Sequence, residues 1–80
     1  MDNIPILLKQ LSSSSSLNVR QSLGSLALLL EVSAENQQIF IKCGGVNMIL
    51  KLLTKPQKRQ IVESGLYALA AAVKNNVSNL

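Results

Sequence analysis

Few side chains in this sequence could carry out chemistry. The chain contains no histidine and only four acidic residues, and no two of these acids pair on one face of a predicted helix. Nucleophilic and acid–base catalysis each need a partner group beside the reacting one, and a metal site needs clustered ligands. We therefore predict that the protein is not an enzyme, takes no small-molecule substrate and holds no metal or cofactor.

The adjacent glycines Gly44 and Gly45 suggest a second kind of chemistry, a loop that cradles a phosphate. Such a loop follows a strand and continues into Gly-Lys-Ser or Gly-Lys-Thr, whereas here a predicted helix precedes the pair and Val46 follows it. Gly44 instead fits the left-handed position that ends many helices. We interpret the two glycines as a corner between helices.

A local cluster of positive charge is formed by Lys55, Lys58 and Arg59 in a chain of net charge +4. Such a patch could bind nucleic acid or an acidic partner. Single-strand binding usually adds aromatic side chains on which bases stack, and the sequence holds one Phe and one Tyr. We interpret the cluster as a solvated loop and expect no nucleic-acid partner.

The single cysteine, Cys43, excludes an internal disulfide and fits a reducing compartment, so we expect a cytoplasmic protein, with the nucleus as the alternative. We predict that Cys43 is a small buried apolar residue at the end of a helix. No apolar run approaches the length of a membrane span, and no apolar helix has a basic opposite face. We expect no membrane partner.

The elements that must position any site are helices, because apolar residues recur with helical periodicity. Asn3, Asn18 with Gln21, and Ser33 are predicted to cap helix starts. Gly24 is costly inside a helix, and it therefore predicts the close approach of a neighbouring helix. Serines 12–16 and Pro56 separate helices. The predicted helices are Ile4–Leu11, one opened by Asn18, Ala34–Lys42, Val46–Leu53 and about Lys58–Lys74, with Val77–Leu80 beginning another.

The sequence matches itself at a shift of about 42 residues. Ile4–Leu11 falls on Val46–Leu53, and Val19 falls on Ile61. A period near 40, with two short helices and one long one, is typical of α-solenoids. The ordered motif then continues as Asn36, Ile39 or Phe40, Gly44-Gly45-Val46, Ile49-Leu50-Lys51-Leu52-Leu53, Ile61, Gly65 and Ala68-Leu69.

This ordered motif resembles the armadillo repeat family over essentially the whole chain. The resemblance implies an all-α, armadillo-like solenoid of about 1.5 to 2 repeats and roughly five helices. Residues 1–80 would form one domain: 1–33 as the end of a first repeat, 34–76 as a complete repeat and 77–80 as the start of a further one. Because neither end carries a polar cap, we expect a fragment of a longer array, or self-association through the open repeat ends.

The resemblance also implies a function, since armadillo proteins bind protein partners along the concave face of their third helices. We predict a protein-binding scaffold, with Tyr67 as the best single anchor; the alternative for Tyr67 is a half-buried core residue with its hydroxyl in water. The residues expected to face the partner are Ser22, Ser25, Leu29, Gln60, Glu63, Ser64, Tyr67, Ala71 and Lys74.

Two more specific functions are alternatives. The run that ends in Lys74-Asn75-Asn76 is similar to the end of a helix in armadillo-like nucleotide exchange factors, co-chaperones of the seventy-kilodalton heat-shock proteins. A nuclear-import adaptor is less favoured. The third helix of those adaptors carries a motif similar to W-A-L-x-N. This chain has Tyr67-Ala68-Leu69-Ala70-Ala71 there and lacks the asparagine.

Overall fold

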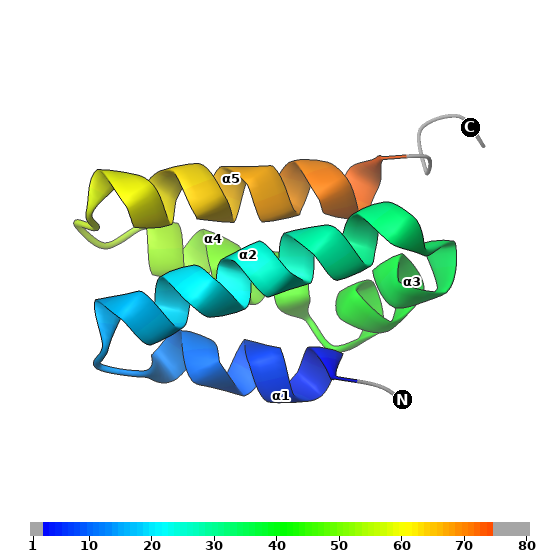
Figure 1. Ribbon diagram of the computed structural model, residues 1–80, viewed down its shortest axis with the longest axis horizontal. Coiled ribbons are helices and arrows are strands. Elements are labelled where there is room, and N and C mark those ends of the chain that lie inside the picture. Colours follow the sequence, from blue (N-terminus) through cyan, green and yellow to red (C-terminus); the bar gives the residue numbers. More distant parts are fainter. Residues whose placement is uncertain (1–2, 75–80) are drawn as a thin grey trace.

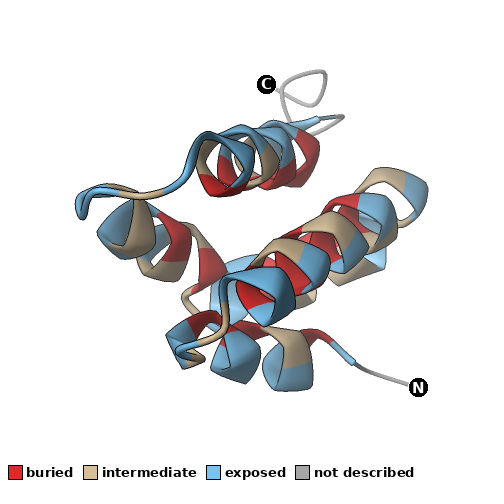
Figure 2. Cartoon of the chain, turned by 60° about the vertical axis from the view of Figure 1, so that its left-hand side comes forward, coloured by how far each residue is buried: buried red, intermediate tan, exposed pale blue. Residues whose placement is uncertain are grey.

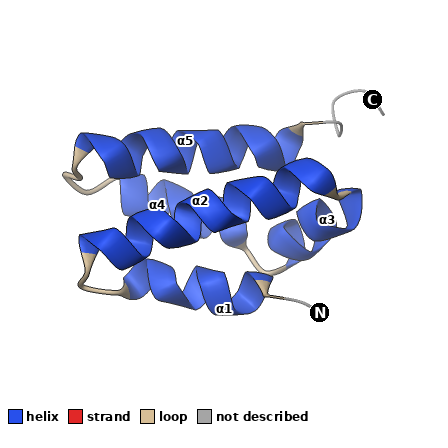
Figure 3. Cartoon of the chain, in the orientation of Figure 1, coloured by secondary structure: helices blue, strands red, loops and turns tan. Residues whose placement is uncertain are grey.

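The computed structural model describes residues 3–74, which form five α-helices, one short 3-10 turn and no strand (Figure 3). The prediction of an all-α fold with roughly five helices is therefore confirmed, whereas the predicted helix start Val77–Leu80 lies outside the described residues. None of the described helices is long and apolar enough to cross a membrane. The helices are α1 (Ile4–Lys9), which continues as the 3-10 turn Gln10–Ser12, α2 (Ser16–Val32), α3 (Ala34–Lys42), α4 (Gly45–Leu53) and α5 (Arg59–Val73).

The two long helices, α2 and α5, lie side by side and run in the same direction (Figure 1). α1 runs antiparallel to α2 along its other side, and α4 packs against α5. α3 lies where α2 ends and contacts α1, α2, α4 and α5. The helix starts of α2 and α5 therefore share one end of the molecule, and their last turns share the other.

The core is aliphatic apart from one aromatic ring, that of Phe40, and lies between the helices (Figure 2). α2 supplies the largest share of it and contacts α1, α3 and α5, so it is buried on more than one face. Leu28 is nevertheless exposed. The buried apolar residues are Ile4, Leu8, Leu11, Val19, Leu23, Leu26, Ala27, Leu30, Phe40, Ile49, Ile61, Ala68, Ala71 and Ala72.

The corner between α3 and α4 forms as the sequence predicts. The Ser33 side chain caps α3 by accepting the N–H of Asn36 at 3.2 Å. Gly44 follows α3 with a left-handed φ of 78°, the sole positive φ of a glycine in residues 3–74. Gly45 is buried because the ring of Phe40 lies where its Cβ would be. The corner therefore needs glycine at 44 for its backbone angle and at 45 for space.

Four local predictions are wrong. Asn18 does not cap α2; the helix begins earlier and Ser15 caps it, accepting the N–H of Asn18 at 3.3 Å. Asn3 precedes α1 but makes no side-chain capping bond. No helix approaches Gly24 closely, since nothing lies within 4 Å of its ideal Cβ position. Cys43 is exposed because it follows the last residue of α3, and the buried face of that helix is centred on Gln37 and Phe40 instead.

Candidate functional site

Seven of the nine predicted partner-facing residues are accessible, and all nine lie on α2, on α5 or just after α5. Leu29 and Ser64 are half-buried. The exposed members are Ser25, Gln60, Glu63, Tyr67 and Lys74.

Ser22 and Ala71 cannot contact a partner, so the prediction is wrong for these two. Ser22 is 1% exposed and its hydroxyl donates to the side-chain carbonyl of Gln10 at 2.6 Å. Ala71 is 2% exposed and belongs to the core on α5. Successive residues of a helix lie about 100° apart around its axis. An error of one position therefore moves a side chain from the exposed face to the face that packs against a neighbouring helix.

Residues spaced by seven mark where the two long helices meet at the surface. Seven residues are nearly two helical turns, so such residues share a face. On α2 they are Leu17 and, two sevens further on, Glu31, and on α5 and its end they are Gln60, Tyr67 and Lys74. Leu17 and Gln60 line one cavity, and Glu31 bonds to both Tyr67 and Lys74. We call the strip bordered by these five residues the α2/α5 seam.

A polar cluster closes the seam near the helix ends. The Tyr67 hydroxyl donates to Glu31 Oε2 at 3.1 Å, and Lys74 Nζ donates to Glu31 Oε1 at 2.9 Å. The Tyr67 side chain is 54% exposed, so neither earlier interpretation is complete: the ring faces solvent and the hydroxyl is bonded to Glu31. We call these three residues the Glu31 cluster.

The Glu31 cluster shifts the pKa of each of its members. Hydrogen bonds from Lys74 and then from Tyr67 lower the pKa of the Glu31 carboxyl below its ordinary value, because they favour the carboxylate. The same carboxylate raises the pKa of Tyr67 and the pKa of Lys74, since each group holds its proton more tightly as a donor to it. At neutral pH the cluster therefore consists of a carboxylate, a phenol and an ammonium group.

α3 holds the ends of both seam helices through two amide side chains. Gln37 Nε2 lies 3.1 Å from the carbonyl oxygen of Leu30, 2.9 Å from that of Ala71 and 2.8 Å from that of Lys74. Asn36 Nδ2 donates to the carbonyl of Leu29 at 2.9 Å. The last carbonyls of a helix have no partner within it, so these amides satisfy the ends of α2 and α5 and fix them relative to each other.

Sequence reasoning missed Glu31 and Gln37. A signal existed for Glu31, because a shift of about 42 residues places it within one position of Lys74, on the equivalent turn of the next long helix. A weaker signal existed for Gln37, which lies three residues before Phe40 and so shares its face of α3.

Neither protein-family models, nor curated proteins, nor solved structures match this chain when compared with it. Among residues 3–74, no three His, Cys, Asp or Glu side chains gather where they could hold a metal ion.

Proposed function

We propose that this chain is an armadillo-like protein-interaction module and that its protein partner binds along the α2/α5 seam. The observation that carries the proposal is the Glu31 cluster, in which α2 and α5 together present an exposed aromatic ring and charged groups of both signs. Two parallel helices joined in this way form a surface to which both contribute, as recognition of an extended segment requires.

Burial that repeats with the sequence match supports the division into two units. At a shift of 42 residues, each of four buried positions on α2 corresponds to a buried position on α5. The pairs are Val19 and Ile61, Leu23 and Gly65, Leu26 and Ala68, and Leu30 and Ala72.

The short helices α1 and α4 support the same division because their matched positions differ in burial. Leu8 is 3% exposed, whereas its match Leu50 is 48% exposed. The reverse holds for Leu7, which is half-buried, and its fully buried match Ile49. This pattern is expected for stacked repeats. The side of each unit that faces its neighbour is buried, and the outer side stays exposed.

Tyr67 is the anchor of the proposed interface. Tyrosine is enriched among the residues that dominate binding energy, because a large ring with two rotatable angles loses little entropy on binding. Here the bond to Glu31 already restrains the side chain before a partner arrives. Pre-ordering of this kind lowers the entropic cost of association.

Selection of binders from a displayed library of random linear peptides tests the proposal. The full chain is the bait, and the affinity of selected peptides is measured by fluorescence anisotropy. We expect Tyr67→Ala to weaken binding by about tenfold, as truncation of an anchor does. The matched control, Ile41→Ala, removes an exposed apolar side chain on α3 and should leave affinity unchanged. Failure to select any peptide, or loss of binding in the control alone, would contradict the proposal.

The two more specific functions stay predictions. No feature of residues 3–74 favours a nucleotide exchange factor over a general scaffold, and Asn75 and Asn76, which prompted that alternative, lie outside the described residues. For an import adaptor, the seam offers an aromatic side chain at Tyr67 but alanine at position 71, where an asparagine would hold a peptide backbone. A cytoplasmic or nuclear location goes with the proposed role.

A further inference from the structure

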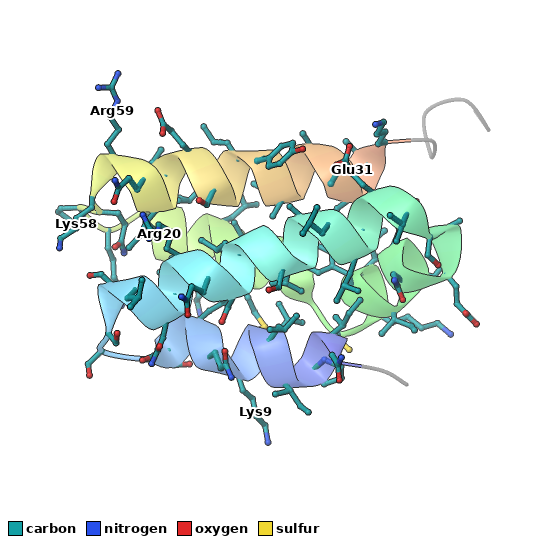
Figure 4. The ribbon with its side chains drawn as sticks, viewed as in Figure 1. Lys9, Arg20, Glu31, Lys58 and Arg59 are labelled. Carbon is teal, nitrogen blue, oxygen red and sulfur yellow. The ribbon has the colours of Figure 1, made fainter. Side chains whose placement is uncertain are left out.

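A cavity of about 180 Å³ opens at the other end of the seam, where α2 and α5 begin. It lies between the two helices, and Figure 4 shows Arg20 on α2 and Lys58 just before α5 at this same end. The cavity is lined by Ser16, Leu17, Arg20, Lys58, Gln60 and Ile61.

The charge of this cavity has no counterpart within the described residues. Arg20 of α2 and Lys58, just before α5, both line it, and neither makes an ion pair with an acid of residues 3–74. The neighbouring Arg59 pairs with Glu63 at 3.5 Å, one turn along α5 and well exposed. Two cationic residues that line one small cavity without an acidic partner among the described residues favour an anionic group bound there.

The size of the cavity sets the size of that group. The cavity measures about 180 Å³ and is open to solvent on one side. That is smaller than the roughly 300 Å³ at which sites for small-molecule ligands begin, but it accommodates one side chain. Leu17 and Ile61 add apolar walls beside the cations, which suits a carboxylate carried on methylene groups.

We propose that the partner inserts an aspartate or glutamate side chain into this cavity, between Arg20 and Lys58, while its backbone continues along the seam to Tyr67. The inference rests on the proposed function and specifies the partner as an acidic extended segment. Gln60 and Tyr67 are seven residues apart, roughly 10 Å along α5. Three to four residues of an extended peptide span this distance.

Nucleic acid fits the same cavity less well. The cavity contains no aromatic side chain, and Tyr67, the sole tyrosine of the chain, lies two turns away. Sequence-tolerant strand binding relies on successive stacked bases together with a tracked backbone. One cavity with two cations instead matches one isolated negative charge.

Peptides selected on the unmodified chain test the inference. We expect Asp or Glu to recur at one peptide position, and replacing that acid with its amide to weaken binding about tenfold, as loss of a charge-assisted contact does. Arg20→Gln and Lys58→Gln should each cause a similar loss. Lys9→Gln is the matched control: it removes the same charge from α1, and Lys9 lies outside the cavity (Figure 4). It should change affinity by less than about twofold.

The outcomes separate this inference from the proposed function. If the selected peptides lack an acid, or bind Arg20→Gln and Lys58→Gln unchanged, the acidic cavity is wrong while dependence on Tyr67 still supports the seam. If Lys9→Gln weakens binding as much as the cavity variants, the effect is one of net charge and the inference fails. Tighter binding of oligothymidylate than of any selected peptide would assign the cavity to nucleic acid and overturn it. Circular dichroism of each variant confirms that the fold is retained.

Discussion

Gln37 on α3 donates its side-chain amide to the carbonyl oxygen of Ala71 on α5, 34 residues further along the chain. The same nitrogen also serves Leu30 and Lys74, so its two hydrogens are shared among three carbonyls. The other side-chain atom, Gln37 Oε1, is buried with no partner among the described residues. The fold therefore uses the donor of this amide and tolerates an unpaired acceptor.

Replacing Gln37 should separate the two roles of the amide. Gln37→Met removes the donor and also the unpaired acceptor, and we expect a loss of about 1–2 kcal/mol in the free energy of unfolding. Gln37→Glu keeps the shape but cannot donate when ionised, and should cost about 3 kcal/mol or more. Urea denaturation measures both. Gln38→Met, at an exposed neighbour, should stay within about 0.5 kcal/mol; an equal loss there would show that the buried amide is not special.

The Glu31 cluster should make stability depend on pH in two windows. Because folding lowers the pKa of Glu31, its contribution is present above about pH 4.3 and is lost as the pH falls through the still lower folded value. Because folding raises the pKa of Tyr67 and the pKa of Lys74, their contributions are lost as the pH rises above about 10.

Glu31→Gln tests these windows. The difference in unfolding free energy between the unmodified chain and this variant should be largest between about pH 5 and 9 and should shrink toward both extremes. Added salt should reduce the difference, since the cluster is partly exposed. Denaturant melts across the pH range provide the measurement, and a difference that stays constant with pH would contradict the assignment.

Two glycines should respond in opposite ways to the same substitution. At Gly24 an added methyl group meets nothing within 4 Å, so Gly24→Ala should stabilise α2 by about 1 kcal/mol through helix propensity. At Gly45 the methyl group would collide with the fully buried ring of Phe40, so Gly45→Ala should cost about 1–3 kcal/mol. Thermal melts should shift upward by about 4–8 °C in the first case and downward in the second. Stabilisation by Gly45→Ala would show that the ring can move.

Exposed apolar residues on α1 and α2 and on α4 and α5 predict self-association between copies of the chain. Ile6, Leu7, Leu28 and Leu29 line a shallow cavity of about 390 Å³ between α1 and α2, and Leu50 and Leu66 are exposed on α4 and α5. Because the two faces differ, the contact would be head-to-tail and would not close on itself.

Sedimentation equilibrium should therefore show a mass that rises with protein concentration. Leu28→Lys or Leu66→Lys should each return the chain to a monomer, because either change blocks one side of the contact. Gln38→Lys, which adds the same charge at an exposed position on α3, should leave the association unchanged. A monomeric mass at every protein concentration would contradict the predicted self-association.

The sequence predicts the ends of a helix well where a single residue determines them. Ser33 and Gly44 each provide a specific backbone interaction or angle, and the bounds of α3 follow from them. The predicted start of α2 was wrong because five consecutive serines compete with Asn18 as caps. Ser15 is the residue that caps the helix. The exposure of Cys43 was missed because the first residue after a helix need not continue its buried face.

The site was less predictable because it depends on pairing between distant residues. Position on a helix indicated Tyr67 and Lys74 correctly as exposed, yet Glu31, which joins them, lies on another helix. Ser22 and Ala71 were misplaced because sequence alone does not fix how far each long helix is rotated about its axis. The cavity between Arg20 and Lys58 depends on two helix starts meeting at one end, which no local pattern contains.

The packing of α2 against α5 also determines when the fold can be completed during synthesis. Val19 and its matched residue Ile61 are 42 positions apart, and a ribosome adds about 5–20 residues per second, so α2 waits about 2–8 s for α5. Through that interval Leu23, Leu26 and Leu30, which are fully buried at the end, lack the helix that covers part of their surface. The nascent chain thus exposes apolar side chains of α2 for far longer than a helix takes to form. During this interval it depends most on protection from aggregation.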